Sequence, residues 1–422
     1  MPSVGEVRSQ PRQGMLQTAA VIAVLKAISG MTSAGVIIIT ARALGPSGRG
    51  VFVLVFTLTT LAMILCGLGI SISGRLQLVA RPNPVSSRDL FGLGSVLAVL
   101  QVLTCAAAAA LLLPLLDVHL AAAVIGIVAA LGGLLFTSFL FVEVLNAYGF
   151  TVAAAVVDVL GSTMQLALVV GVATAGQTTV KWYVAALAAA YGFQTLVGAV
   201  YLRRLRVNLR PRFRGAQWRR LLAHGPSGMT VQFGQYSVFK VDRYFVAAFL
   251  SPAAVGLYSV AAAFPEMLRV LPVALAQPVF YGLSSQSTSN EDFARARRIC
   301  LAVMVVGAAV AVLLAPLMVR VLFGDEYAGA VSALRLLVVA EVGLAVYYVD
   351  SSALSGQRRV REAAAAVLVG LVVALVGYAT LIPWLGINGA AIASMIAYAS
   401  MGAVAHVRLH GQGKASATPL GR

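Results

Sequence analysis

Five charged residues lie within two strongly apolar stretches near the middle of the chain. Lys240, Asp242 and Arg243 fall in the first stretch, and Glu266 and Arg269 fall in the second. A charge at the centre of a membrane-spanning helix costs about 2.5–3.5 kcal/mol on insertion scales. Such residues therefore indicate either a polar pathway or internal ion pairs. Their spacing of three residues would also let Glu266 and Arg269 neutralise each other on one helix face.

The basic residues of this group predict a site for an anion. Lys240 and Arg243 share a helix face, whereas Asp242 points about 100° away and is expected to face another helix or a cation. Lys26 lies within the apolar run nearest the N-terminus, and Arg42 lies at the end of that run. We predict that Lys26, Lys240 and Arg243 line a central cavity that binds a phosphate or diphosphate, because charge-assisted hydrogen bonds are strong at low dielectric. The alternatives are interhelical salt bridges and, for Arg42, a side chain that reaches the outer interface.

A second set of charged residues has two open roles, coupling to an ion or proton and pairing between helices. It comprises Asp242, Glu266, Arg269, Glu341 and Asp350. Glu143 and Asp158 are interpreted as helix-end charges at the membrane interface. The four histidines and three cysteines show no metal-ligand spacing, so no metal or cofactor is predicted.

The elements that must position these side chains are membrane helices. Of the 422 residues, 60% are hydrophobic and only 11% are charged, against about 25% in a soluble domain. Apolar runs of about 20 residues recur along the chain and predict an all-α membrane protein with about twelve spans. The spans are expected near residues 16–41, 51–73, 90–115, 119–145, 151–175, 181–202, 226–249, 254–283, 299–322, 330–354, 363–383 and 386–407.

The basic residues also predict the orientation. The net charge of +17 would suggest nucleic acid in a soluble protein, but here most of the cations lie in alternate short loops, as the positive-inside rule requires. We therefore predict no nucleic-acid partner, a multi-pass protein of the inner (plasma) membrane, and both termini in the cytoplasm. The basic loops include Arg8, Arg75, Arg81, Arg88, Arg295, Arg358 and Lys414, and the opposite loops hold only Arg42, Arg49, Lys181 and Arg320.

Two halves of the chain resemble each other. Leu44–Phe52 and Leu250–Tyr258 share the pattern L-[GS]-P-x-x-x-G-x-[FY], 206 residues apart, and Gly-Ala-Val recurs at 198–200 and 402–404. The near-constant offset predicts two pseudo-symmetric six-helix lobes around a central cavity, with substrate at their interface. The expected units are an N-lobe at 1–202, a basic cytoplasmic linker at 203–225 and a C-lobe at 226–422. The linker is interpreted as a topological anchor rather than a specific partner site.

Four segments carry a resemblance to a known family. They are ARALGPSGRGVFVLVFTLTTL, VDRYFVAAFLSPAAVGLYSVAAAFPEMLRVLPVALAQPVF, LFGDEYAGAVSALRLLVV and IPWLGINGAAIASMIAY. In order and spacing they resemble the polysaccharide (O-antigen and capsule repeat-unit) flippases of the multidrug/oligosaccharidyl-lipid/polysaccharide exporter superfamily. The resemblance implies a MATE-like fold that moves an undecaprenyl-diphosphate-linked oligosaccharide from the cytoplasmic to the outer leaflet by alternating access. It also implies a polysaccharide polymerase and glycosyltransferases as pathway partners.

The same resemblance bears on the site. Lys26, Arg42, Lys240 and Arg243 match in kind the cationic cavity residues of such families, and Asp242-Arg243 matches the Asp-Arg usual at that place. The N-lobe is poorer in buried basic residues than the lipid II flippase relatives, which makes a peptidoglycan precursor a less favoured cargo.

Two other functions stay open at this stage. A cation-coupled multidrug antiporter of the same superfamily would need acidic residues in the cavity. A membrane glycosyltransferase would need a metal-binding carboxylate pair on a loop, and the sequence contains no D-x-D motif. We therefore expect a transporter rather than an enzyme.

Overall fold

The computed structural model describes residues 12–79, 85–223, 225–284, 289–357 and 359–411, and these ranges contain helices and no strand. Of the basic loop residues, Arg8, Arg81, Arg358 and Lys414 lie outside them. The helices are α1 (Arg12–Cys66), α2 (Ile70–Val79), α3 (Ser87–Leu111), α4 (Ala122–Ala147), α5 (Thr151–Thr174), α6 (Val180–Arg204), α7 (Gly215–Ala223), α8 (Gly225–Lys240), α9 (Asp242–Phe249), α10 (Pro252–Leu268), α11 (Val270–Ser284), α12 (Asn290–Phe323), α13 (Ala330–Gly356) and α14 (Val360–Gly411).

The described helices can be counted as twelve potential membrane crossings, the number that the apolar runs predict. Nine helical segments of the described chain are long and apolar enough to span a membrane. The longest two, α1 and α14, each reverse at a glycine with positive φ, Gly45 (φ 63°) and Gly386 (φ 60°), and so cross twice. The twelfth crossing is the pair α8 and α9, which Val241 separates.

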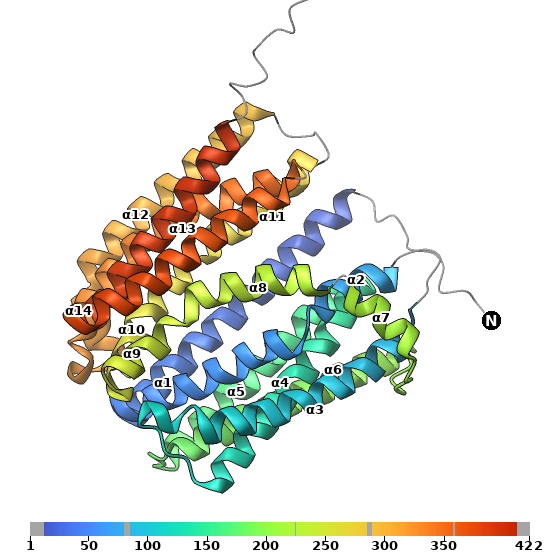
Figure 1. The fold of residues 1–422 in the computed structure, drawn as a ribbon, viewed down its shortest axis with the longest axis horizontal. Coiled ribbons are helices and arrows are strands. Elements are labelled where there is room, and N and C mark those ends of the chain that lie inside the picture. The colour runs from blue at the N-terminus through green and yellow to red at the C-terminus, as the bar shows by residue number, and fades with distance from the viewer. Residues whose placement is uncertain (1–11, 80–84, 224, 285–288, 358, 412–422) are drawn as a thin grey trace, which may run out of the picture.

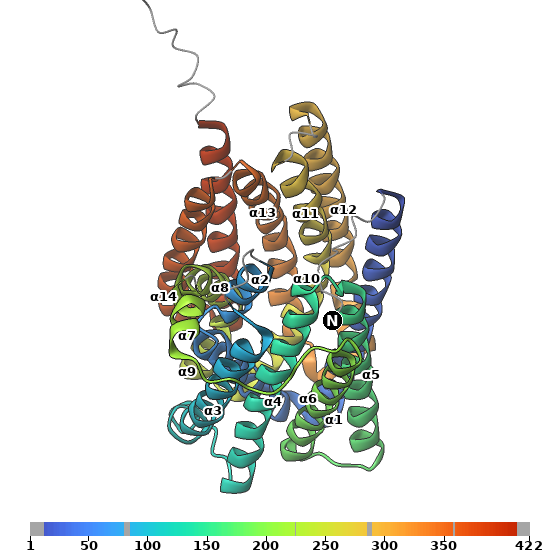
Figure 2. The same cartoon turned by 90° about the vertical axis from the view of Figure 1, so that its right-hand side faces the viewer.

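The crossings form two lobes that diverge like a V. Helices α1–α6 make one arm and α8–α14 the other, and the arms converge near α9 and spread apart away from it (Figure 1; Figure 2 gives the view from the side). We call the end where the lobes meet the closed end, and the opposite end the open end. Buried apolar side chains of both lobes pack together in the largest core cluster, where Tyr244 and Tyr327 donate hydrogen bonds across the interface to the carbonyls of Leu54 and Ala41 (3.2 and 2.9 Å). The bounds given above for the lobes and the linker stay a prediction.

The two copies of the repeated motif pack against each other at the closed end. A Cβ atom added to Gly50 would lie 1.7 Å from the Pro252 carbonyl oxygen, and one added to Gly256 would lie 1.9 Å from the Pro46 carbonyl oxygen. The glycine that both copies share, Gly50 in one and Gly256 in the other, therefore contacts the proline of the other copy. This reciprocal contact gives the sequence repeat a physical reason, because only glycine permits the lobes to approach so closely.

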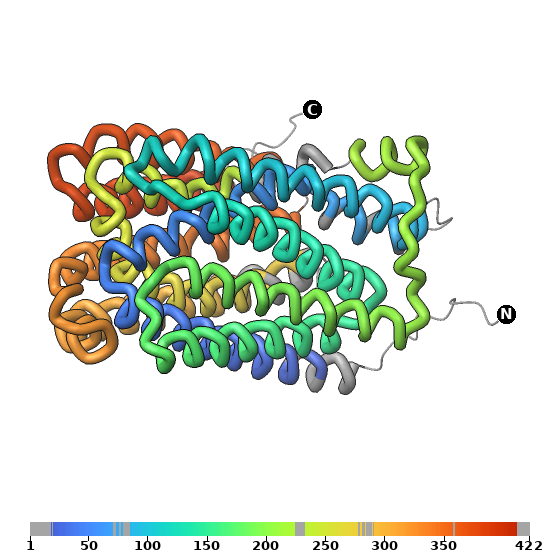
Figure 3. Tube along the Cα trace, turned by 90° about the horizontal axis from the view of Figure 1, so that it is seen from below, coloured from blue at the N-terminus to red at the C-terminus, as the bar shows by residue number. Residues whose placement is uncertain are grey.

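The basic segment between the lobes is tied to the N-lobe. It crosses from the end of α6 to α7 over the open end of that lobe (Figure 3). The Arg212 backbone N–H donates to the Arg88 carbonyl (2.8 Å), and the Phe213 and Trp218 rings pack edge to face at 5.9 Å. The start of α3 thus holds the linker through its main chain.

Candidate functional site

A cavity of about 230 Å³ lies between the two lobes and contains a cluster of charges. Its charged lining residues are Arg49 of α1, Lys240 at the end of α8, Arg243 of α9 and Glu266 of α10. The break at Val241 begins α9 at Asp242, whose buried carboxylate accepts a hydrogen bond from the Arg243 backbone N–H (2.8 Å). Asp242 is thus held by its own helix start.

Two cations of the cavity share one carboxylate. The Lys240 Nζ lies 2.8 Å from both Glu266 oxygens, and the Arg243 Nη2 lies 2.8 Å from Glu266 Oε1. The Nε and Nη1 atoms of Arg243 are buried and have no hydrogen-bond partner among the described residues. The cluster therefore has excess positive charge and unused donors.

Arg49 adds a third cation that the sequence prediction missed. It was placed in an outer loop, but the structure buries it at 5% exposure within α1. Its Nη1 donates to Thr40 Oγ1 (2.6 Å), while its Nε has no partner among the described residues. Its position inside the repeated motif, where the other copy has the apolar Val255, is the sequence feature that could have indicated that Arg49 is buried. Arg49 also gives the N-lobe a buried basic residue.

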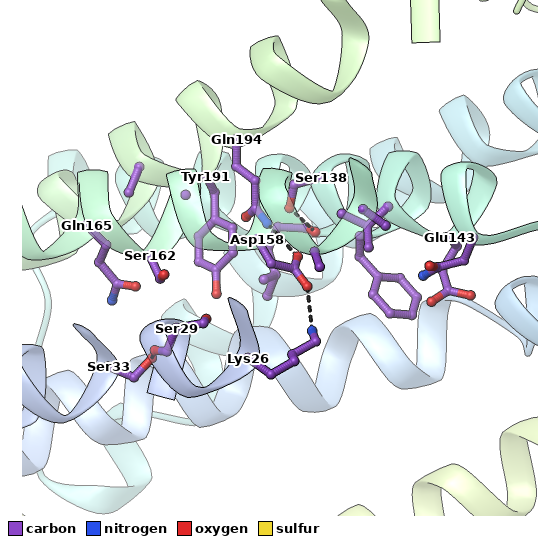
Figure 4. Close-up of a pocket in the computed structure, with 18 of the residues that line it drawn as sticks. Lys26, Ser29, Ser33, Ser138, Glu143, Asp158, Ser162, Gln165, Tyr191 and Gln194 are labelled. Carbon is purple, nitrogen blue, oxygen red and sulfur yellow. Dashed lines mark hydrogen bonds and ion pairs between the residues drawn. The ribbon is translucent and has the colours of Figure 1, made fainter. Parts of the chain in front are cut away.

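A larger pocket of about 730 Å³ lies within the N-lobe, between α1, α4, α5 and α6 (Figure 4). There Lys26 Nζ lies 2.7 Å from Asp158 Oδ2, and Gln194 Nε2 donates to Asp158 Oδ1 at 3.1 Å (Figure 4). At the other end of the pocket Arg75 holds both oxygens of Glu143, at 2.5 and 2.6 Å. Each carboxylate of the pocket is thus paired with a cation.

This pocket corrects three predictions. Lys26 was expected opposite Lys240 and Arg243, but it lines the N-lobe pocket and pairs with Asp158. Glu143 and Asp158 were interpreted as charges at the membrane interface without helix partners, but both line the pocket, where each pairs with a cation of another helix. Arg75 was expected in a loop and belongs to α2 instead. In each case a partner from a distant part of the chain sets the side-chain direction.

The cavities share lining residues and therefore lie next to one another. Ser33, Gln165 and Tyr191 line both the central cavity and the N-lobe pocket. A third cavity, of about 360 Å³, has mainly apolar and aromatic walls; it shares Tyr236 with the central cavity and Phe139 with the N-lobe pocket. The polar tract thus runs from the interface of the lobes into the N-lobe.

Two further buried ion-pair groups lie in the described part of the C-lobe. Arg269 pairs with Glu341 at 2.5 and 3.1 Å, and its guanidinium lies 4.2 Å from the centroid of the Phe239 ring. Glu266 and Arg269 therefore do not pair with each other, as their spacing had allowed. Glu266 pairs with the cations of the central cavity, and Arg269 pairs with Glu341 of α13. Asp350 is fully buried and lies near two basic groups, Arg297 Nε at 2.9 Å and His406 Nδ1 at 3.0 Å.

Arg42 lies outside the three cavities. Its exposed side chain donates to the main-chain carbonyls of Val321 and Leu322, the latter at 2.9 Å. These carbonyls belong to the last turn of α12, whose dipole favours a cation. The structure thus places Arg42 as a link between the lobes at the closed end, in place of the predicted position in the cavity.

Solved transporter structures share this arrangement over almost the whole chain. An inward-facing multidrug resistance MATE family transporter of the MOP superfamily is 16% identical with a TM-score of 0.77, covering 94% of this chain and 100% of that one. The lipid II flippase MurJ in an inward closed conformation is 12% identical with a TM-score of 0.77, covering 94% and 87%. A MOP superfamily transporter from Pyrococcus furiosus is 16% identical with a TM-score of 0.66, covering 98% of each chain. The fold is therefore that of the MOP superfamily transporters.

The family is identified by sequence. The family described as "Polysaccharide biosynthesis protein" matches residues 39–332, which is more than half of the chain. The chain belongs to this family. No curated protein sequence matches it. The protein is thus a multi-pass membrane protein of a polysaccharide biosynthesis family, with the fold of the MOP superfamily transporters.

Proposed function

We propose that this protein flips a polyprenyl-diphosphate-linked oligosaccharide from the cytoplasmic to the outer leaflet of the inner membrane. The observation that carries the proposal is the central cavity, where Arg49, Lys240 and Arg243 surround the single carboxylate of Glu266. Buried N–H donors without partners favour an anion with several oxygens, because an unsatisfied buried charge is costly. A diphosphate has more acceptor oxygens than the resident carboxylate.

The two-lobed fold supplies the route. With both termini in the cytoplasm, the open end of the V faces the cytoplasm and the closed end faces outward. The substrate would enter between the lobes, and rocking of one lobe against the other would expose it to the outer side. Glycosyltransferases would supply the lipid-linked oligosaccharide, and a polysaccharide polymerase would use it after transfer.

The charge pairing favours this function over the two alternatives. An antiporter of cationic drugs needs an unpaired carboxylate in its cavity, and a glycosyltransferase that holds a metal needs two. In the described cavities Glu143, Asp158 and Glu266 each pair with a basic side chain. The buried charged groups of the central cavity that keep unpaired atoms are cations, Arg49 and Arg243.

The test is the pool of lipid-linked sugar in cells that lack this gene. We expect undecaprenyl-diphosphate oligosaccharide to build up on the cytoplasmic side, and the wild-type gene to relieve it. Lys240→Ala and Arg243→Ala should fail to relieve it while reaching the membrane in normal amounts. Arg335→Ala is the matched control, because this exposed cation, within the described ranges, donates only to the Val312 carbonyl and should complement fully.

Two results would count against the proposal. An unchanged lipid-linked pool together with a shift in drug sensitivity would support the antiporter. Full complementation by both cavity variants would show that Lys240 and Arg243 are not needed to bind the substrate and serve only as structural partners of Glu266.

A further inference from the structure

We propose that the N-lobe pocket binds the sugar portion of the substrate, as a carbohydrate subsite separate from the cationic site for the diphosphate. This inference rests on the proposed function and assigns a ligand to the pocket of Figure 4. The central cavity would hold the anionic group, and the first sugars would extend into the N-lobe.

The chemistry of the pocket differs from that of the central cavity. Its charges are neutralised in pairs, Lys26 with Asp158 and Arg75 with Glu143. Most of its remaining polar groups are neutral hydroxyls and amides; those labelled in Figure 4 are Ser29, Ser33, Ser138, Ser162, Gln165, Tyr191 and Gln194. A ligand that is neutral and rich in hydroxyl groups fits such a lining better than an anion or a cation does.

Several of these groups have free hydrogen-bonding capacity. The side-chain amides of Asn146 and Gln165 and the Tyr191 hydroxyl have no hydrogen-bond partner among the described residues. An amide both donates and accepts, as a sugar hydroxyl does, so the two can form paired hydrogen bonds. The Asp158 carboxylate, with one contact on each oxygen, keeps acceptor capacity for a further hydroxyl.

Size and position agree with this assignment. The pocket encloses about 730 Å³, within the range of about 300–1,000 Å³ that is typical of small-molecule sites, whereas the central cavity encloses about 230 Å³. A sugar bonded directly to the diphosphate must lie next to it. Ser33, Gln165 and Tyr191 line both spaces, so a diphosphate at Lys240 and Arg243 would place its first sugar at the entrance of the pocket.

The experiment compares two lipids that differ only in their sugars. The probes are undecaprenyl diphosphate and the lipid-linked oligosaccharide purified from cells that lack this gene, each titrated against the purified full-length protein. The variants are Asn146→Ala and Gln194→Ala, because these residues line the N-lobe pocket but not the central cavity. Gln177→Ala is the control, since this exposed glutamine follows α5 outside the pocket.

We expect each pocket variant to weaken binding of the glycosylated lipid about three- to tenfold, the loss of one hydrogen bond. Binding of undecaprenyl diphosphate should stay unchanged, and the control should alter neither lipid. If Asn146→Ala does not yield folded protein, Ser29→Ala removes a hydroxyl of the same pocket and is expected to act in the same direction.

Three outcomes would overturn the inference, and they differ from a failure of the proposed function. The subsite is wrong if the pocket variants bind both lipids as the wild type does, or if they lose both lipids equally. It is also wrong if the wild type binds the two lipids with equal affinity. Failure of the wild type to bind either lipid would instead reject the flippase proposal itself, and the subsite with it.

Discussion

The reciprocal contact at the closed end makes a quantitative prediction about the transport cycle. In Gly256→Ala the new Cβ would lie 1.9 Å from the Pro46 carbonyl oxygen, whereas ordinary Cβ contacts begin at 3.4 Å. The carbonyl is main chain and cannot rotate away, so the lobes must separate locally by about 1.5 Å. Overpacking of this kind costs about 1–3 kcal/mol. The cost applies only while the closed end is shut.

The substitution should therefore shift the protein towards a state with the closed end open. A differential free energy of about 1–3 kcal/mol changes the equilibrium between two states by about 5- to 150-fold. Spin labels at Thr178 and Glu326, both exposed at the closed end of opposite lobes, report the separation by pulsed electron resonance. We expect a longer distance to gain population in Gly256→Ala, and to gain it further in the double variant with Gly50→Ala.

Gly171→Ala provides the control, because a Cβ at this α5 glycine meets no atom within 4 Å. It should leave the distance distribution unchanged. The reasoning is refuted if Gly256→Ala gives the same distances and the same thermal stability as Gly171→Ala. A loss of stability without any population of longer distances would show that the contact holds the fold together but does not act as a gate.

Two further predictions concern the buried charges. Glu341→Ala would leave the buried Arg269 guanidinium without its carboxylate and should lower the free energy of unfolding by about 3–5 kcal/mol. Thermal unfolding in detergent measures this loss. The control is Asp325→Ala, which removes one partner of the exposed pair with Arg320 and should change stability little. An equal effect of the two substitutions would contradict the argument. Glu266→Gln would remove the counter-charge of the cavity cations and should tighten binding of inorganic diphosphate about tenfold by calorimetry, whereas weaker or unchanged binding would show that Glu266 does not compete with the anion.

The sequence predicted the features of the fold that follow from continuous local signals. Long apolar runs define the twelve crossings, and short polar or glycine-containing gaps between runs mark the reversals at Gly45 and Gly386. The spaced proline and glycine of the two motifs revealed the repeat. Their reciprocal packing could not be predicted, because it depends on where two segments about 200 residues apart meet in space.

The partners of the buried charges were harder to predict, because sequence spacing is only one of the factors that select them. Glu266 and Arg269 have the spacing of a helical ion pair, yet α10 ends at Leu268 and the two side chains turn to different helices. Lys26 and Asp158 meet across 132 residues. Packing decides such pairs, since each buried charge takes the opposite charge that the neighbouring helix presents. Arg49 was missed because a residue near a turn was assumed to face water.

The two lobes share a repeated sequence motif, but their charged residues and ion pairs differ. At equivalent places of the repeated motif the N-lobe has Arg49 in the central cavity, and the C-lobe has Val255 in the core. The ion pair of Arg269 with Glu341 joins C-lobe helices and is buried, so separating those helices would leave an uncompensated charge. In the N-lobe the Lys26 side chain is 59% exposed in its pair with Asp158, and exposed pairs are weak. We therefore expect the C-lobe to move as a rigid unit, while the pairs of the N-lobe pocket rearrange around the substrate.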